Sequence, residues 1–142
     1  MRDGTYAILV VQREARPALD EAKAFFQGRH TDTRFFSVTM PQVIEVGHID
    51  GIVKDLRMRI HEIKSAAIPY EGVHLVLDCP VTVSALVGYE LSNRLPHISL
   101  WQYHTAGPRM DRPKASEKYE YWGPLERFVD IVNSIERAVP SS

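Results

Sequence analysis

The segment Val73–His104, with the sequence VHLVLDCPVTVSALVGYELSNRLPHISLWQYH, decides the fold. Its first seven residues, Val73–Cys79, are almost continuously apolar, which is typical of a strand buried on both faces within a parallel sheet. Pro80 stops this strand and suits the first turn of a helix, where its missing N–H group costs nothing. We therefore predict a helix from Pro80 to about Leu95, followed by a second strand at His97–His104.

The spacing of apolar residues supports both elements. Five apolar residues of the predicted helix recur at helical spacing and share one face: Val83, Leu86, Val87, Leu91 and Leu95. In the second strand, alternation puts Ile98 and Leu100 on one face and Trp101 and Tyr103 on the other. A strand, a helix and a strand joined by short connections form one crossover unit of a parallel sheet.

Strands and helices also alternate through the rest of the chain. The further elements that the pattern predicts are a buried strand at Tyr6–Gln12, a helix at Pro17–Gln27, a strand at Arg34–Thr39, a helix with its apolar stripe from Ile49 to Ile63, a short strand at Tyr119–Trp122 and a terminal helix that starts at Gly123-Pro124. Thr105–Ser116 is rich in glycine, proline and charge and predicts a surface loop of the kind that often covers a site. The order of elements indicates an α/β, Rossmann-like, three-layer fold with a mostly parallel sheet.

Composition narrows the class of protein. A chain of 142 residues suits one domain, residues 1–142, and 44% hydrophobic with 25% charged residues is typical of a folded, soluble protein. We find no apolar run long enough to span a membrane and no signal peptide, so we expect a cytoplasmic protein. A net charge of -1 gives no electrostatic basis for binding long nucleic acid.

Several familiar catalytic patterns are missing from the sequence. No GxGxxG follows the first strand, and neither GxxxxGK[ST] nor GxSxG occurs. The six histidines include no pair at metal-ligand spacing, so we expect no metal and no cofactor. Cys79 precedes a helix, which favours a nucleophile, but a phosphatase-type loop needs an arginine where Ala85 stands. We take Cys79 as a small buried residue and keep a reactive thiol as the alternative.

Parallel sheets place their ligands beyond the carboxyl ends of the strands, near the point where the strand order reverses. Here this rule selects four segments: Gln12–Arg16, Thr39–Gln42, Asp78–Ser84 and Tyr103–Gly107. Thr82 and Ser84 fall in the first turn of the central helix, where free N–H groups and the helix dipole favour an anion. Simple capping of that helix explains the two residues equally well.

Charged and titratable residues at the same edge extend this candidate site. Arg13 and Arg16 follow the first strand and suit bidentate contacts with a phosphate, although exposed arginines are often only solvated. His104 ends the last parallel strand and suits an acid, a base or a donor in the transition state. The predicted ligand-binding residues are Gln12, Arg13, Arg16, Pro80, Thr82, Ser84 and Tyr103, and the predicted catalytic residues are His104 and Ser84.

The central segment resembles the second half of SAVED domains, the cyclic-oligonucleotide sensors of bacterial anti-phage defence, which are related to the CARF domains of type III CRISPR systems. In that family a short apolar strand, a small residue with a proline, a helix with an alanine–leucine–glycine core and a final strand follow in this order. Here they are matched by His74–Leu77, Cys79-Pro80, Ala85–Gly88 and Ile98–Tyr103. The proline-started helix and its glycine are the most specific parts of the match.

The resemblance implies a CARF-like fold whose ligand, a cyclic oligoadenylate or a related cyclic trinucleotide, lies across the strand ends. The biological setting that it implies is type III CRISPR or CBASS defence in bacteria or archaea. A SAVED domain joins two CARF-like halves and usually carries an effector, whereas this chain corresponds to one half. A two-fold site for a cyclic ligand would therefore require a homodimer.

Three functions stay open at this point. The resemblance implies binding of the messenger, with or without metal-independent ring cleavage, in which a ribose 2′-hydroxyl attacks the neighbouring phosphate. The alternative is a non-enzymatic interaction subunit that completes a larger sensor or effector complex. A third alternative is an enzyme that uses Cys79 as its nucleophile.

Overall fold

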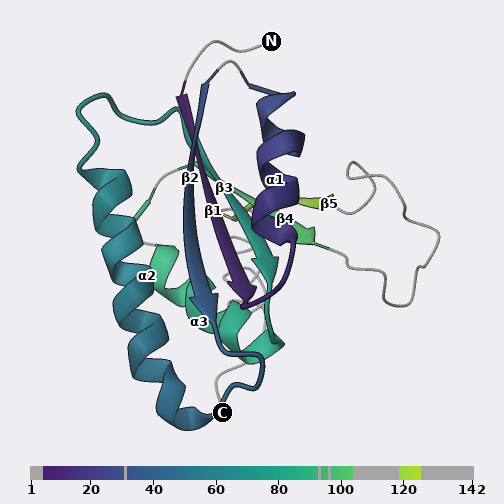
Figure 1. The fold of residues 1–142 in the computed structure, drawn as a ribbon. Helices are drawn as coiled ribbons and strands as arrows, with labels where there is room; N and C mark the ends of the chain where they lie inside the picture. The colour runs from purple at the N-terminus through teal and green to yellow at the C-terminus, as the bar shows by residue number, and fades with distance from the viewer. Residues whose placement is uncertain (1–4, 31, 93, 96, 104–118, 126–142) are drawn as a thin grey trace, which may run out of the picture.

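The computed structural model describes residues 5–30, 32–92, 94–95, 97–103 and 119–125. In chain order the elements are β1 (Thr5–Arg13), α1 (Ala18–Gln27), β2 (Asp32–Met40), a 3-10 turn η1 (Val46–His48), α2 (Ile49–Lys64), β3 (Gly72–Asp78), α3 (Val81–Leu91), β4 (Ile98–Tyr103) and β5 (Tyr119–Pro124) (Figure 1). The predicted order of strands and helices is thus confirmed over the described residues. The expected loop at 105–116 and the body of the expected terminal helix lie outside them.

One five-stranded sheet organises these elements, in the order β2-β1-β3-β4-β5. Strands β1 to β4 are mutually parallel, and β5 runs antiparallel to β4. The α/β class and the mostly parallel sheet are confirmed, and the arrangement is compatible with a Rossmann-like fold. From β1 the chain moves to β2 on one side and then crosses to β3 on the other, so the strand order reverses between β1 and β3.

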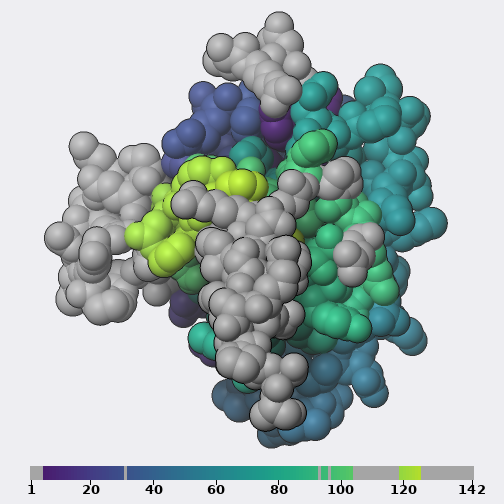
Figure 2. All heavy atoms as spheres, turned by 180° about the vertical axis from the view of Figure 1, so that it is seen from behind, coloured from purple at the N-terminus to yellow at the C-terminus, as the bar shows by residue number. Residues whose placement is uncertain are grey.

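Helices cover both faces of the sheet, because alternate residues of the central strands point to opposite sides. Ala7, Leu9 and Val11 of β1 join the core beneath α2 and α3. Tyr6, Ile8 and Val10 join the core beneath α1. Figure 1 shows α1 in front of the sheet and α2 and α3 behind it, and Figure 2 shows the latter two side by side from behind. The three-layer arrangement is therefore confirmed.

Every residue of β3 is buried, as the apolar run predicts. The helix that follows is shorter than predicted, because α3 ends at Leu91 rather than near Leu95. After Leu91 the chain continues as a turn, in which Arg94 N and Leu95 N both donate to Leu91 O, at 3.1 and 3.3 Å. The Leu95 side chain nevertheless reaches the core, so its apolar character was a sign of burial and not of helix.

A second predicted boundary, the end of the strand at Tyr119–Trp122, also differs in the structure. The predicted strand at Tyr119–Trp122 is confirmed, but β5 continues through Gly123 and Pro124, which we had assigned to the start of a helix. Gly123 has φ +109, a conformation that side chains disfavour, beside a register shift at Leu100 and Trp101. Proline is tolerated there because β5 is the last strand of the described sheet.

None of the described helices is both long enough and apolar enough to cross a membrane.

Candidate functional site

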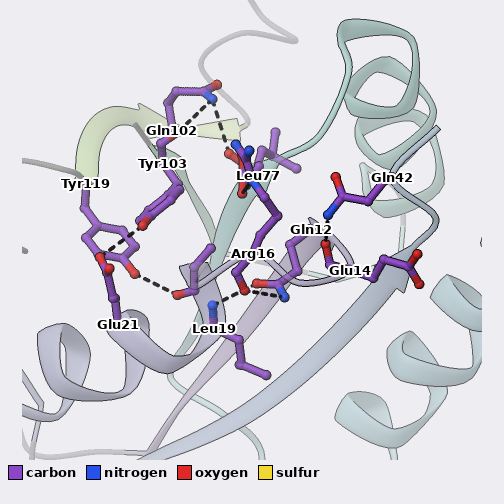
Figure 3. A network of polar contacts seen from close by, with 12 residues as sticks. Gln12, Glu14, Arg16, Leu19, Glu21, Gln42, Leu77, Gln102, Tyr103 and Tyr119 are labelled. Carbon is purple, nitrogen blue, oxygen red and sulfur yellow. Dashed lines mark hydrogen bonds and ion pairs between the residues drawn. The ribbon is translucent and has the colours of Figure 1, made fainter. Parts of the chain in front are cut away.

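The candidate site lies at the carboxyl ends of β1, β3 and β4, where the sheet rule places a ligand. Residues 14–17 connect β1 to α1, and residues 79–80 connect β3 to α3. These two connections flank the reversal of strand order. Figure 3 shows the polar contacts that hold this edge together.

An ion pair joins the two connections. Arg16 donates from Nε to Asp78 Oδ2 at 3.0 Å and from a terminal nitrogen to Asp78 Oδ1 at 3.1 Å, so the contact is bidentate. The Asp78 side chain is 10% exposed and that of Arg16 is 30% exposed. The hydrogen bond to Asp78 raises the pKa of Arg16 above its ordinary value. The pair neutralises Arg16, which therefore offers an anion less charge than the sequence alone suggested.

Gln12 holds the connection between β1 and α1 in place through two side-chain hydrogen bonds. Its side-chain nitrogen donates to Arg16 O at 3.1 Å, and its side-chain oxygen accepts from Leu19 N at 2.9 Å (Figure 3). Because the residue is 7% exposed, both contacts are protected from water. Gln12 thus fixes the loop that carries Arg16 and begins α1, which places it behind the edge and not on its surface.

Tyr103 has a comparable role on the α1 side of the sheet. Its hydroxyl donates to Glu21 Oε2 at 3.0 Å, and the neighbouring Tyr119 hydroxyl donates to Ala18 O at 2.8 Å. Burial, followed by the hydrogen bond to Glu21, raises the pKa of Tyr103. The two hydroxyls therefore anchor the first turns of α1 against β4 and β5, and both phenols stay protonated.

The start of α3 is uncapped and open to solvent. Pro80 is its N-cap, and no side chain among the described residues caps the helix. The first N–H groups of a helix have no partner within it, and the dipole makes this end positive. Thr82 is exposed and Ser84 is partly exposed, so solvent reaches this turn. The capping role that Thr82 and Ser84 offered as an alternative is not seen.

Arg13 is the second arginine of the predicted set. Its Nε is buried and has no hydrogen-bond partner among the described residues. Gln12 pairs with Asp78 across β1 and β3, so Arg13 and Cys79 follow neighbouring strand ends, and Cys79 directly precedes Pro80 at the start of α3. A buried donor without a partner costs on the order of 1–3 kcal/mol.

Cys79 behaves as a buried thiol. Burial raises its pKa, which disfavours the thiolate that a nucleophile needs. Its sulfur lies 3.3 Å from the Ser84 hydroxyl. These contacts support the structural role of Cys79 and weigh against the enzyme that would attack through it.

A small cavity of about 290 Å³ lies beside this edge, between the end of β2 and the start of α2. Thr39 and Pro41 line it from the strand side, and His48 and Asp55 line it from the helix side. The predicted segment Thr39–Gln42 therefore borders a hollow. No group of three or more potential metal ligands occurs within the described part of the chain.

The structure thus brings together Gln12, Arg13, Arg16 and the start of α3, while Tyr103 lies toward α1. His104, the predicted catalytic histidine, lies outside the described residues. Sequence analysis missed the role of Asp78 as the partner of Arg16. An acid at the end of an apolar strand, one strand away from two arginines, was the signal that could have revealed it.

In comparisons with known proteins, no family model matches the chain, and no curated protein matches it.

Proposed function

We propose that this protein binds a cyclic oligonucleotide, of the cyclic oligoadenylate class, at the carboxyl edge of its sheet. The observation that carries the proposal is the uncapped start of α3, exposed at the reversal of strand order beside the unpartnered Nε of Arg13. An anion at a helix start gains about 0.3–1 kcal/mol from the dipole in exposed sites. A hydrogen bond to a charged group adds about 1.5–3 kcal/mol. A phosphate group at the helix start would gain from the dipole and from the positive charge of Arg13.

The choice of a cyclic oligonucleotide over a single phosphate rests on the resemblance of Val73–His104 to SAVED domains. A cyclic oligonucleotide repeats the same phosphate around a ring, so it suits a site that two copies of one chain build about a two-fold axis. Each chain would contribute one α3 and one Arg13. We therefore propose a homodimer as the binding species.

Ring cleavage would extend this proposal without requiring a metal. In such a reaction a ribose 2′-hydroxyl of the ligand attacks the adjacent 3′-phosphate, and the bond from phosphorus to the 5′-oxygen of the next nucleoside breaks. The products are a 2′,3′-cyclic phosphate and a 5′-hydroxyl, and the protein positions the nucleophile and stabilises charge on the phosphate. Arg13 and the start of α3 would stabilise that charge, and the Ser84 hydroxyl would contact the phosphate. His104 would supply or accept the proton.

A second candidate function is an interaction subunit of a larger sensor or effector. The observation that favours it is the exposure of large apolar side chains in the segments that follow β2 and β3: Val43 is 74% exposed, Val46 90% and Val81 84%. Exposed apolar side chains that gather at one edge are typical of a protein interface. A stable heteromer recovered from native cells would favour this alternative.

Binding of radiolabelled cyclic tetra-adenylate, measured by filter retention, tests the proposal. We expect Arg13→Gln to weaken binding by about tenfold to a hundredfold, because it removes one charged contact. Arg34→Gln is the matched control: it makes the same change in charge at an exposed residue opposite Ala7, near the start of β1. Equal effects of the two variants would indicate only a general loss of positive charge and would contradict the site.

The same mixture, run on a denaturing gel, separates binding from cleavage. Linear product formed in the presence of a chelator identifies a metal-independent ring nuclease, and intact ring with retained label identifies a binding protein. If no cyclic di-, tri- or tetranucleotide is retained by the unmodified protein, the proposal is wrong.

A further inference from the structure

A second cavity, larger than the one beside β2, lies at the other end of the parallel strands, where the strands begin. Its volume is about 520 Å³, within the roughly 300–1,000 Å³ typical of small-molecule sites. Tyr6 lines it near the start of β1, Gly72 and His74 at the start of β3, and Ser99 near the start of β4. It is therefore separate from the carboxyl edge, which holds the site proposed above.

Rings dominate the wall of this cavity. Five of the ten lining residues carry an aromatic or imidazole ring: Tyr6, His30, Tyr70, His74 and His97. Tyr6 stacks on His30 with 3.9 Å between the ring centroids and 20° between the planes. His74 stacks against both of these rings, with centroids at 5.5 and 4.8 Å. A wall of this kind favours a flat ligand that stacks or packs edge-on.

Hydrogen bonds fix which nitrogen of each histidine carries a proton. The Trp101 indole donates from Nε1 to His74 Nδ1 at 2.9 Å, so Nδ1 is an acceptor and the proton of neutral His74 is on Nε2. His74 Nε2 lies 2.7 Å from His30 Nε2, which must then accept. The proton of His30 is left on Nδ1. The network thus ends in one oriented N–H donor on a residue that lines the cavity.

The charges around the cavity weigh against a strongly charged ligand. No lysine or arginine is among its described lining residues, and Glu71 contributes a carboxylate, whereas the charges of Arg29 and Arg34 act on the lining rings from outside the wall. Neither sign of charge dominates the cavity, so a strongly charged ligand gains little there. A metal ion is disfavoured because no group of three potential ligands exists within the described residues. The tautomers also keep His30 neutral, because a proton added to its Nε2 would face the N–H on Nε2 of His74. The site suits a neutral molecule.

The backbone around the cavity is tightly fitted. His97 has φ +54, an uncommon conformation for a residue with a side chain and one that is often found at functional sites. Gly72 lets the His97 backbone and the Tyr6 ring pack closely against β3, because a Cβ at this position would lie 3.2 Å from His97 O and 3.3 Å from Tyr6 Cε1. The cavity is therefore a formed feature of the fold at the start of three adjacent strands.

We propose that this cavity is a second binding site, for a neutral, planar nitrogen heterocycle that accepts a hydrogen bond from His30 Nδ1. The free base or its nucleoside fits this chemistry better than a nucleotide, because the described lining offers a phosphate one carboxylate, Glu71, and no lysine or arginine. The site stands on its own residues and does not depend on binding at the carboxyl edge.

Adenine, which is neutral at pH 7.5, is a suitable probe, and Trp101 is a natural reporter. The chain has two tryptophans, and Trp122→Phe removes the exposed one and leaves the indole that donates to His74. We expect adenine to change the fluorescence of this variant saturably at pH 7.5. Adenosine 5′-monophosphate should bind at least about threefold more weakly than adenine, because no lysine or arginine in the described lining would hold its phosphate and Glu71 would oppose it.

Ser99→Leu, made in the Trp122→Phe background, fills the cavity and should weaken adenine binding by about tenfold or more. Ala24→Leu is the control, since Ala24 is exposed on α1 and lines neither cavity. Gly72→Ala provides a second, smaller obstruction if Ser99→Leu lowers the yield of folded protein. No saturable change with adenine, or equal binding by the Ser99→Leu and Ala24→Leu proteins, overturns the proposal.

The tautomers give an independent readout by nitrogen NMR of the imidazoles. We expect the Nδ1 resonance of His30 to move on addition of adenine, while His61, which is exposed on α2, stays unchanged. If adenine binds without moving the His30 resonance, the assigned donor is wrong and the proposed mode of recognition fails.

Discussion

Arg16 and Asp78 lie 62 positions apart in the chain and form one contact across the reversal of strand order. Their burial is unequal, because the carboxylate is 10% exposed while the arginine side chain is 30% exposed. Removing one partner of a buried ion pair leaves the other charge unpaired. The free-energy cost of that unpaired charge increases with the burial of the residue that carries it. The two residues should therefore differ in what their removal costs.

We expect Arg16→Ala to lower the free energy of unfolding by about 2–3 kcal/mol, because it leaves the buried Asp78 carboxylate without a positively charged partner. Asp78→Ala should cost about 1 kcal/mol, because Arg16 can turn toward water. Urea unfolding followed by circular dichroism measures both values. The opposite order would show that the carboxylate is solvated in the folded protein.

His74 is the second residue whose surroundings determine its behaviour. It is 9% exposed inside an apolar strand, between Trp101 and His30. Desolvation, reinforced by the charges of His30 and Arg29, lowers its pKa from 6.5 to about 4. The unfolded chain therefore binds a proton at this residue at a higher pH than the folded chain does.

Stability should consequently fall as the pH drops from about 6.5 to about 4. A shift of this size corresponds to about 3 kcal/mol lost across that window, and none is lost above it, where His74 is neutral in both states. Unfolding free energies at half-unit pH steps measure the slope. His74→Gln should flatten the slope, whereas His61→Gln, at an exposed residue, should leave it intact. An equal slope in all three proteins would contradict this assignment.

At the scale of elements, α2 and α3 depend on both apolar packing and charge. Leu56 of α2 is fully buried, whereas Met58, two positions later on the same helix, is 53% exposed. Arg57 of α2 donates to the buried Glu90 of α3 at 3.0 Å, and Arg94 also contacts Glu90. The arginine contact lowers the pKa of Glu90, which keeps the carboxylate charged and able to join the two helices.

We predict that Leu56→Ala lowers the free energy of unfolding by about 2–5 kcal/mol, because it opens a cavity between α2 and the sheet. Met58→Ala should change it by less than about 0.5 kcal/mol, since surface substitutions seldom do more. Chemical denaturation of both variants tests this contrast. Similar losses would mean that a partner or another part of the chain covers Met58.

At the scale of the whole molecule, the order β2-β1-β3-β4-β5 places the start of α3 and the β1–α1 connection together at one edge. One chain presents one such edge, so the proposed cyclic ligand would need two chains. The two cavities at opposite ends of the strands also allow two classes of ligand to be tested separately.

Saturating cyclic tetra-adenylate should therefore yield a species of two chains and one ring, measured by sedimentation velocity with labelled ligand. The two-fold symmetry of both partners is the reason for this stoichiometry. Arg13→Gln protein at the same concentrations should bind little ligand. A ratio of one ring to one chain at saturation would contradict the homodimeric site.

The sequence alone determined much of this fold. Continuous apolar runs predicted β1 and β3, alternation predicted β4, and helical spacing predicted α1, α2 and α3, because these periods follow from local backbone geometry. Helix ends were less certain: Leu95 kept the helical spacing although α3 stops at Leu91. Gly123 and Pro124 looked like a helix start because residue type alone cannot show that the chain there is still paired with β4.

Only the tertiary structure decided which side chains meet. The sequence placed Arg16 and Gln12 at a candidate edge, but it could not show that Asp78 takes the arginine or that Gln12 holds the loop. It gave no sign that His30, His74 and Trp101 share one network beside a cavity. Periodicity is a property of neighbours along the chain, whereas these contacts depend on strand order and register, which bring distant residues within hydrogen-bond distance.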